Sequence, residues 1–261
     1  MVVPSRKQVS VRGTKNVYNS GFKHIPQHLW TEIFARVASQ SIPALSNVKM
    51  CSKSFLEAAS ESYVFEHATL KKFPVLFKNV GGASSFFKQC KDFGNSEALF
   101  LQGLKDFFDG LKIELGLELL NKAVDKKHPG AKYVYGIILA CHGGRHKEKG
   151  LKLLHSLTTS ESKSTYLIIR KCRKEVKRAF TGMWLHNKLV ENDVINFRDY
   201  MKQCNCNEKR MTSDIGGKNK SAWDVKDYDE GLYNTSSCES CLWDNEVIQF
   251  RHMLKTGSFK V

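Results

Sequence analysis

The sequence has little of what a membrane protein or a β-rich fold requires. Only five of its 261 residues are proline, runs of β-branched residues are few, and the longest strongly apolar run is Tyr133–Cys141. That run is far shorter than the ~20 residues a membrane-spanning helix needs. The basic N-terminal stretch has no apolar segment of the kind a secretory signal contains. We therefore expect a protein of the nucleus or the cytoplasm without membrane contact, whose eight cysteines are reduced thiols or metal ligands.

The sequence also lacks the common catalytic motifs. It contains no glycine-rich phosphate loop, no Gly-x-Ser-x-Gly elbow and no His-Glu-x-x-His pair. Four scattered cysteines occupy apolar or amphipathic stretches, where a thiol usually serves packing: Cys51, Cys90, Cys141 and Cys172. We expect no catalytic residue and no enzymatic activity.

Positive charge is concentrated in two stretches of the chain. Of the net charge of +15, residues 1–24 supply five bases without an acid, and residues 145–178 supply eleven bases against three acids. Basic runs usually form a solvated surface, and a nuclear signal or a contact with an acidic partner is the alternative. Residues 1–23 hold few large apolar groups, which predicts a disordered basic arm.

Leu, Lys, Glu and Ala recur at helical spacing, which predicts a mostly α fold. Residues 24–72 form the first helical unit. Pro26 suits a helix start, and apolar side chains then follow at Leu29, Trp30, Ile33, Phe34 and Val37. This apolar surface is wider than one core-facing stripe requires, which indicates a second face that binds a partner. Ser41 precedes a second helix start at Ile42-Pro43, and a third helix contains Phe55.

These residues resemble the F-box, a three-helix motif. The resemblance is carried by Ile25-Pro26-x-x-Leu29-x-x-Glu32-Ile33-Phe34-x-x-Val37, followed by Leu45-x-x-Val48-x-x-Cys51-x-Lys53-x-Phe55, where Phe55 replaces a common Trp. It implies binding to a Skp-type adaptor and, through that adaptor, to a cullin-RING ubiquitin ligase. The residues implied in or under this contact are Ile25, Pro26, Leu29, Trp30, Ile33, Phe34, Val37, Leu45, Val48 and Phe55.

A connector at residues 73–95 leads to a repeat region at residues 96–203. Residues 98–104 match residues 131–137 at an offset of 33, and residues 116–120 match residues 150–154 at an offset of 34. Such a period predicts stacked helical hairpins. Small residues explain how the helices approach: Ala98 and Gly103 permit close packing, and Gly116 and Gly150 mark the starts of the second helices. Two further helices are expected within residues 162–203, where they cap or complete the stack.

The segment from Lys122 to Gly136 resembles the Sel-like branch of the tetratricopeptide repeats. This resemblance implies a concave face that binds protein partners, and a plain helical spacer is the alternative. An F-box, Sel-like repeats and a cysteine-bearing tail in this order resemble a group of plant F-box proteins. The resemblance therefore implies a substrate-recognition adaptor that recruits an unknown target protein for ubiquitination.

A nucleic-acid- or chromatin-associated module is the alternative function. It would use the basic stretch 145–178 together with a zinc-bound tail. No aromatic residue interrupts the basic run between Arg170 and Lys174, so the stacking platform typical of single-strand binders is missing there. The sequence therefore favours a protein partner over nucleic acid.

Residues 204–261 are expected to form an irregular C-terminal module. Two cysteine pairs suit a tetrahedral structural zinc ion, the candidate cofactor: Cys204 with Cys206, and Cys238 with Cys241. The C-x-C pair is less typical than C-x-x-C, and His186 or His252 could replace one thiolate. The alternative is a tail of unrelated thiols ending in an amphipathic helix that carries Trp243, Val247, Phe250 and Leu254.

Overall fold

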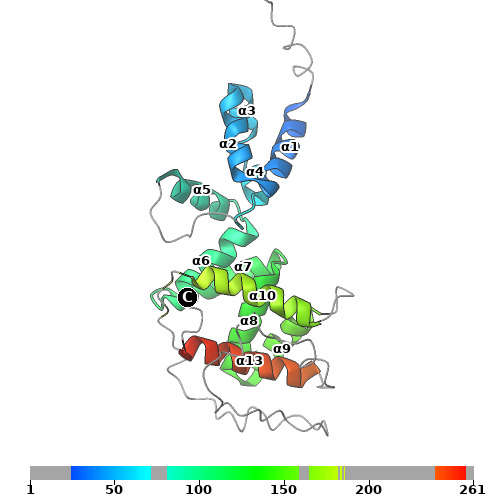
Figure 1. Ribbon diagram of the computed structural model, residues 1–261, viewed down its shortest axis with the longest axis vertical. Helices are drawn as coiled ribbons and strands as arrows, with labels where there is room; N and C mark the ends of the chain where they lie inside the picture. Colours follow the sequence, from blue (N-terminus) through cyan, green and yellow to red (C-terminus); the bar gives the residue numbers. More distant parts are fainter. Residues whose placement is uncertain are drawn as a thin grey trace, which may run out of the picture.

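The structure is a computed structural model that describes residues 25–71, 81–158, 165–181, 183, 185 and 239–256. Every regular element in these ranges is an α-helix, as the sequence predicts. A small helical unit lies at one end of an elongated molecule, and a larger layered body lies at the other (Figure 1). Within the same ranges, no helix has both the length and the apolar character needed to cross a membrane.

The small unit consists of four helices, α1 (Gln27–Gln40), α2 (Ile42–Cys51), α3 (Lys53–Ala58) and α4 (Ser62–His67). Serine side chains begin two of them. The Ser41 hydroxyl accepts from Ala44 N at 3.3 Å, and the Ser52 hydroxyl accepts from Phe55 N at 3.2 Å. Each bond satisfies a backbone N–H that a helix start leaves without a partner. The three expected helices are present, and α4 adds a fourth that the sequence pattern did not predict.

The expected connector contains a helix of its own, α5 (Gly81–Asp92). Two phenylalanines hold this segment against α4, since Phe65 lies 5.5 Å from Phe86 and 5.6 Å from Phe93 between ring centroids. The segment therefore continues the packing of the small unit toward the larger body.

The larger body begins with two helical hairpins. Their helices are α6 (Ser96–Phe108), α7 (Ile113–Asp125), α8 (Pro129–His142) and α9 (Gly144–His155). The first residues of α6 and α8 are 33 residues apart, as the period predicts. A single residue, Gly143 with φ of 73°, separates α8 from α9.

Each hairpin crosses at a pair of glycines. A Cβ on Gly103 would lie 3.1 Å from the backbone oxygen of Gly116, and a Cβ on Gly136 would lie 3.2 Å from that of Gly150. Gly116 and Gly150 therefore lie inside their helices at the crossing, and they do not mark the helix starts as expected. The absent side chains let the two backbones touch, which explains why glycine recurs at both repeat positions.

Two more helices, α10 (Thr165–Phe180) and α13 (Glu239–Thr256), complete the body against α8 (Figure 1). Phe108 of α6, Phe180 of α10 and Phe250 of α13 form one aromatic cluster, with centroid distances of 4.8 and 6.4 Å. The amphipathic helix considered for the tail is thus present, but it is not part of a separate module. Trp243, Val247 and Phe250 are buried in the same core as the repeats.

Candidate functional site

The first helix of the small unit has two apolar faces. Phe34, Ala35 and Ala38 are buried inside the unit, whereas Leu29 is 46% exposed and Ile33 is 42% exposed. Leu29 and Ile33 are four residues apart, so they lie on the same side of α1, one turn apart. As the sequence predicts, α1 therefore carries more apolar surface than the core of its own unit covers.

Three aromatic rings pack together next to this exposed pair and stabilise α1. Trp30 stacks on Phe34 at 5.5 Å between centroids, and Phe55 of α3 contacts both rings at 4.7 and 5.2 Å. Aromatic contacts of this geometry contribute ~0.5–1.5 kcal/mol each beyond the area they bury. Phe55 therefore closes an aromatic cluster that packs α3 against α1.

The structure separates the sequence-predicted site residues into three groups. Phe34 and Leu45 are buried and therefore support the surface without forming it. Pro26, Leu29 and Ile33 are exposed, and the remaining five are half-buried: Ile25, Trp30, Val37, Val48 and Phe55. Two further exposed apolar residues were missed, Met50 at the end of α2 and Leu56 on α3. The position of Met50 next to the end of a predicted helix was the sequence signal that could have indicated its exposure.

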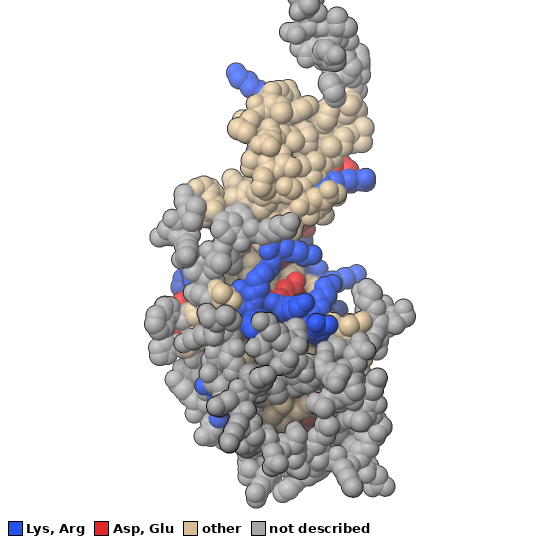
Figure 2. All heavy atoms as spheres, viewed as in Figure 1, with Lys and Arg blue, Asp and Glu red and all other residues tan. Residues whose placement is uncertain are grey.

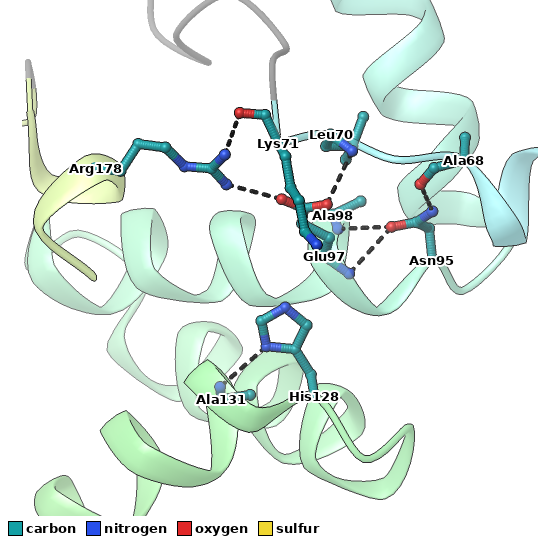
Figure 3. A network of polar contacts seen from close by, with 9 residues as sticks. All are labelled: Ala68, Leu70, Lys71, Asn95, Glu97, Ala98, His128, Ala131 and Arg178. Carbon is teal, nitrogen blue, oxygen red and sulfur yellow. Dashed lines mark hydrogen bonds and ion pairs between the residues drawn. The ribbon is translucent and has the colours of Figure 1, made fainter. Parts of the chain in front are cut away.

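A network of polar contacts fixes the small unit to the repeats (Figure 3). Asn95 caps α6, because its Oδ1 accepts from the backbone N–H groups of Glu97 and Ala98 at 3.0 Å each. Its Nδ2 donates to three backbone oxygens in and directly after the last turn of α4, those of Phe65, Glu66 and Ala68, at 2.8–2.9 Å. The buried Asn95 side chain thus connects two elements by five hydrogen bonds.

Glu97 extends the same network to α10. Its Oε2 accepts from Leu70 N at 2.9 Å, and its Oε1 pairs with Arg178 Nη2 at 2.8 Å (Figure 3). Arg178 also donates to the backbone oxygen of Lys71. Helix α6, the segment after α4 and helix α10 therefore meet at the Glu97 carboxylate, which restricts rotation of the small unit relative to the repeats. The sequence signal for these residues was the helix start Asn95-Ser96-Glu97-Ala98.

His128 caps α8 beneath this network. Its Nδ1 accepts from Ala131 N at 3.1 Å, and its ring stacks on Phe100 at 4.5 Å. Burial, together with the charges of Lys71 and Arg178, lowers the pKa of His128 to about 4. The imidazole is therefore neutral at pH 7, as its role as a hydrogen-bond acceptor requires.

A buried ion pair joins the last two helices to the repeats. Arg173 of α10 donates from Nε to Glu246 Oε1 of α13 at 2.8 Å, and a second bond links its Nη2 to Oε2. The Tyr133 hydroxyl of α8 donates to the same carboxylate, and burial together with Glu246 raises the pKa of Tyr133 well above its ordinary value. The Glu246 carboxylate of α13 thus joins α10 through Arg173 and α8 through Tyr133.

No group of three or more metal-ligating side chains lies within the described ranges. Cys204, Cys206 and Cys238 lie outside those ranges, and Cys241 falls in the first turn of α13 without a described side chain. The zinc site therefore stays a prediction.

The four described cysteines are free thiols. Burial raises the pKa of Cys90 to about 12 and that of Cys141 to about 12, and it also raises the pKa of Cys172. Buried thiols of this kind are inert at neutral pH. Cys51 differs from the expectation of an apolar setting, because it is exposed and donates to the backbone oxygen of Asn47 at 3.3 Å.

The hairpins and their period define a helical-repeat protein with a tetratricopeptide-like array. A family model of plant tetratricopeptide repeats matches residues 70–181, a range that begins ahead of α5 and ends with α10. The chain is also 30% identical over 242 residues to an Arabidopsis thaliana protein named "Putative F-box protein", covering 92% of this chain and 80% of the relative. The chain belongs to the family of this plant protein. No solved structure matches the chain at a significant level.

Proposed function

We propose that this protein is the substrate-recognition subunit of a Skp-cullin-F-box ubiquitin ligase, and that α1–α4 is its F-box. The observation that carries the proposal is the exposed pair Leu29 and Ile33 on α1, in a chain related over 242 residues to a plant protein with an F-box name. A small helical unit that leaves large apolar groups exposed is suited to a permanent partner. The proposed partner is a Skp-type adaptor.

Packing around the pair supports a preformed docking surface. Phe34, Trp30 and Phe55 hold α1 in place from its inner side, so little ordering is needed when a partner binds. Preorganisation of this kind increases affinity because fewer side chains lose freedom on association. Burial of one large apolar side chain contributes about 1.5–3 kcal/mol, so two such residues can dominate a small interface.

The polar junction supports the adaptor role for a geometric reason. Asn95 and Glu97 hold the end of α4 against α6, and the Lys126–Glu66 ion pair adds a contact from the end of α7. A rigid link between a docking end and a recruiting end keeps a bound target at a fixed place near the ubiquitin-charged enzyme. This raises the effective concentration of the target lysine. In this role the protein carries no active site of its own, and we propose that it acts in the nucleus or the cytoplasm.

Substitution of the exposed pair tests the proposal. Purified full-length protein carrying Leu29→Glu and Ile33→Glu should lose at least ~100-fold in affinity for a purified plant Skp-type adaptor, since two apolar contacts of this size are removed and charge is buried. Leu115→Glu is the matched control, because Leu115 is 43% exposed on α7, far from α1. Circular dichroism verifies that both variants are folded. Equal adaptor binding by the two folded variants would exclude α1 as the docking surface.

A further inference from the structure

Helix α10 separates its residues cleanly into an inner and an outer face. The inner face is buried against α8 and its neighbours, and it consists of Ile169, Cys172, Arg173, Val176, Ala179 and Phe180. These positions recur every three or four residues, as one side of a helix requires. The opposite, outer face of α10 is exposed to solvent in the described structure.

The outer face is strongly basic. Arg170, Lys171 and Lys174 are all exposed, and Arg178 continues the same side one turn further on. Figure 2 shows Lys and Arg side chains gathered at this place, just beyond the α1–α4 unit. Part of the basic stretch 145–178 therefore lies on one side of α10.

The acids near this face are turned inward. Glu175 is the only acid on α10, and its Oε2 lies so close to α8 that a Cβ on Gly130 would be 2.7 Å away. Burial raises the pKa of Glu175. Glu97 is engaged with Leu70 and Arg178. These carboxylates therefore leave the charges of Arg170, Lys171 and Lys174 available to an outside partner.

An apolar side chain lies on the same side of the helix. Leu167 is 45% exposed, and it precedes Arg170 and Lys171 by three and four residues, the spacing of neighbours on a helix surface. Together these residues form a row with an apolar contact at one end and positive charges along the rest. A peptide segment rich in Asp and Glu with one apolar residue has the complementary pattern.

Nucleic acid fits this row less well. No aromatic residue lies between Arg170 and Arg178 to stack on a base.

We propose that the outer face of α10, formed by Leu167, Arg170, Lys171 and Lys174, binds an acidic segment of a partner protein. This proposal rests on the proposed function, because it names the chemical class of the target that the adaptor recruits. The face lies beside the junction with α1–α4, so a segment bound there is held at a fixed position relative to the ligase.

Fluorescence anisotropy with the full-length protein tests this assignment. The probe is a labelled twelve-residue peptide of Glu and Asp with one central Leu, compared with the same peptide carrying Gln and Asn. The acidic peptide should bind, and the neutral one should not. Reversal of three charges, Arg170→Glu, Lys171→Glu and Lys174→Glu, should weaken binding by about tenfold or more, because several attractive pairs become repulsive.

The matched control reverses the same residue types on α9, Arg145→Glu, Lys149→Glu and Lys152→Glu, all at exposed positions. Binding should change less than about threefold, since distant charges are screened by salt. The neutral variant Arg170→Gln, Lys171→Gln and Lys174→Gln replaces the reversed one if the latter does not fold.

The outcomes separate this proposal from the docking proposal. Unchanged adaptor binding by the α10 variant, with loss of the acidic peptide, supports the assignment. No peptide binding by the wild-type protein overturns it, even if the adaptor binds normally. Equal losses for the α9 and α10 variants, or tighter binding of a labelled twelve-nucleotide single strand than of the peptide, overturn it as well.

Discussion

Glu97 and Arg178, which are 81 residues apart in the chain, form an ion pair of 2.8 Å at the base of the α1–α4 unit. Glu97 simultaneously accepts from Leu70 N, and Arg178 also contacts the Lys71 backbone. One pair of side chains thus holds the segment that leaves α4 between α6 and α10. These contacts therefore hold the α1–α4 unit in place beside the repeats.

Asn95 should be among the most sensitive polar positions of the chain. Asn95→Ala removes the α6 cap and leaves three carbonyl oxygens without their donor, so we expect unfolding to become easier by about 2–4 kcal/mol. Asn95→Asp keeps the cap acceptor but places a carboxylate against those carbonyls, and it should be similarly destabilising. Urea denaturation measures both. A loss below ~1 kcal/mol for both variants would show that the junction is dispensable for stability.

The glycine crossings should tolerate no side chain. A Cβ on Gly116 would lie 2.8 Å from Phe107 Cα, and one on Gly150 would lie 2.7 Å from Ala140 N. Gly116→Ala and Gly150→Ala should therefore each destabilise the protein by about 1–3 kcal/mol, because backbone must move. Gly82→Ala is the control: Gly82 lies in α5 with nothing within 4 Å of its Cβ position, and alanine there should be neutral or stabilising.

His128 should make stability depend on pH. Its folded pKa of about 4 lies below the ordinary value of 6.5, so between these values the unfolded chain binds a proton that the folded chain does not. Stability should therefore fall as pH drops from 6.5 toward 4, by at most about 3 kcal/mol from this residue.

His128→Asn provides the comparison, because asparagine caps a helix but does not titrate. Chemical denaturation at pH 7 and pH 4.5 should show a smaller loss for this variant than for the wild type. The contribution of Glu175, whose raised pKa acts in the opposite direction, is common to both proteins and cancels in the difference. Identical pH profiles would mean that His128 titrates normally.

The buried pair Arg173–Glu246 should behave differently from an exposed one. Arg173→Met leaves the Glu246 carboxylate buried without its cation, which should cost about 3–5 kcal/mol. Adding Glu246→Leu should restore much of the loss, because the carboxylate left without its cation is then removed. Lys122→Met is the control, since the Lys122–Glu118 pair is more than half exposed and contributes about 0–1 kcal/mol. A single-variant loss as small as that of Lys122→Met would contradict the buried arrangement.

The local features of the fold could be predicted from the sequence because their causes are local. Ser41 caps a helix where a serine precedes Ile-Pro, and the glycines that repeat at offsets of 33 and 34 do lie at equivalent crossings. The apolar width of α1 also led correctly to an exposed pair. Each of these signals involves residues within one helix or one repeat period.

The features that were missed depend on contacts between distant segments. Nothing local predicts that Asn95 reaches back to Ala68, or that Arg173 on the inner side of α10 meets Glu246 on α13. A charged residue in phase with Ile169 and Val176 was a signal of a buried partner, but it did not identify which acid. The same limit explains why α13 was assigned to a separate tail.

In the proposed function, the α1–α4 unit docks this protein on a cullin-RING ligase through Leu29 and Ile33. Affinity purification of the tagged full-length protein from plant cells, followed by quantitative mass spectrometry, tests it most directly. We predict that a Skp-type adaptor and a cullin co-purify with the wild-type protein and with the Leu115→Glu control. The Leu29→Glu, Ile33→Glu variant should lose both. Absence of these subunits from the wild-type sample would exclude docking on the ligase. Their undiminished recovery with the double variant would exclude Leu29 and Ile33 as the docking surface.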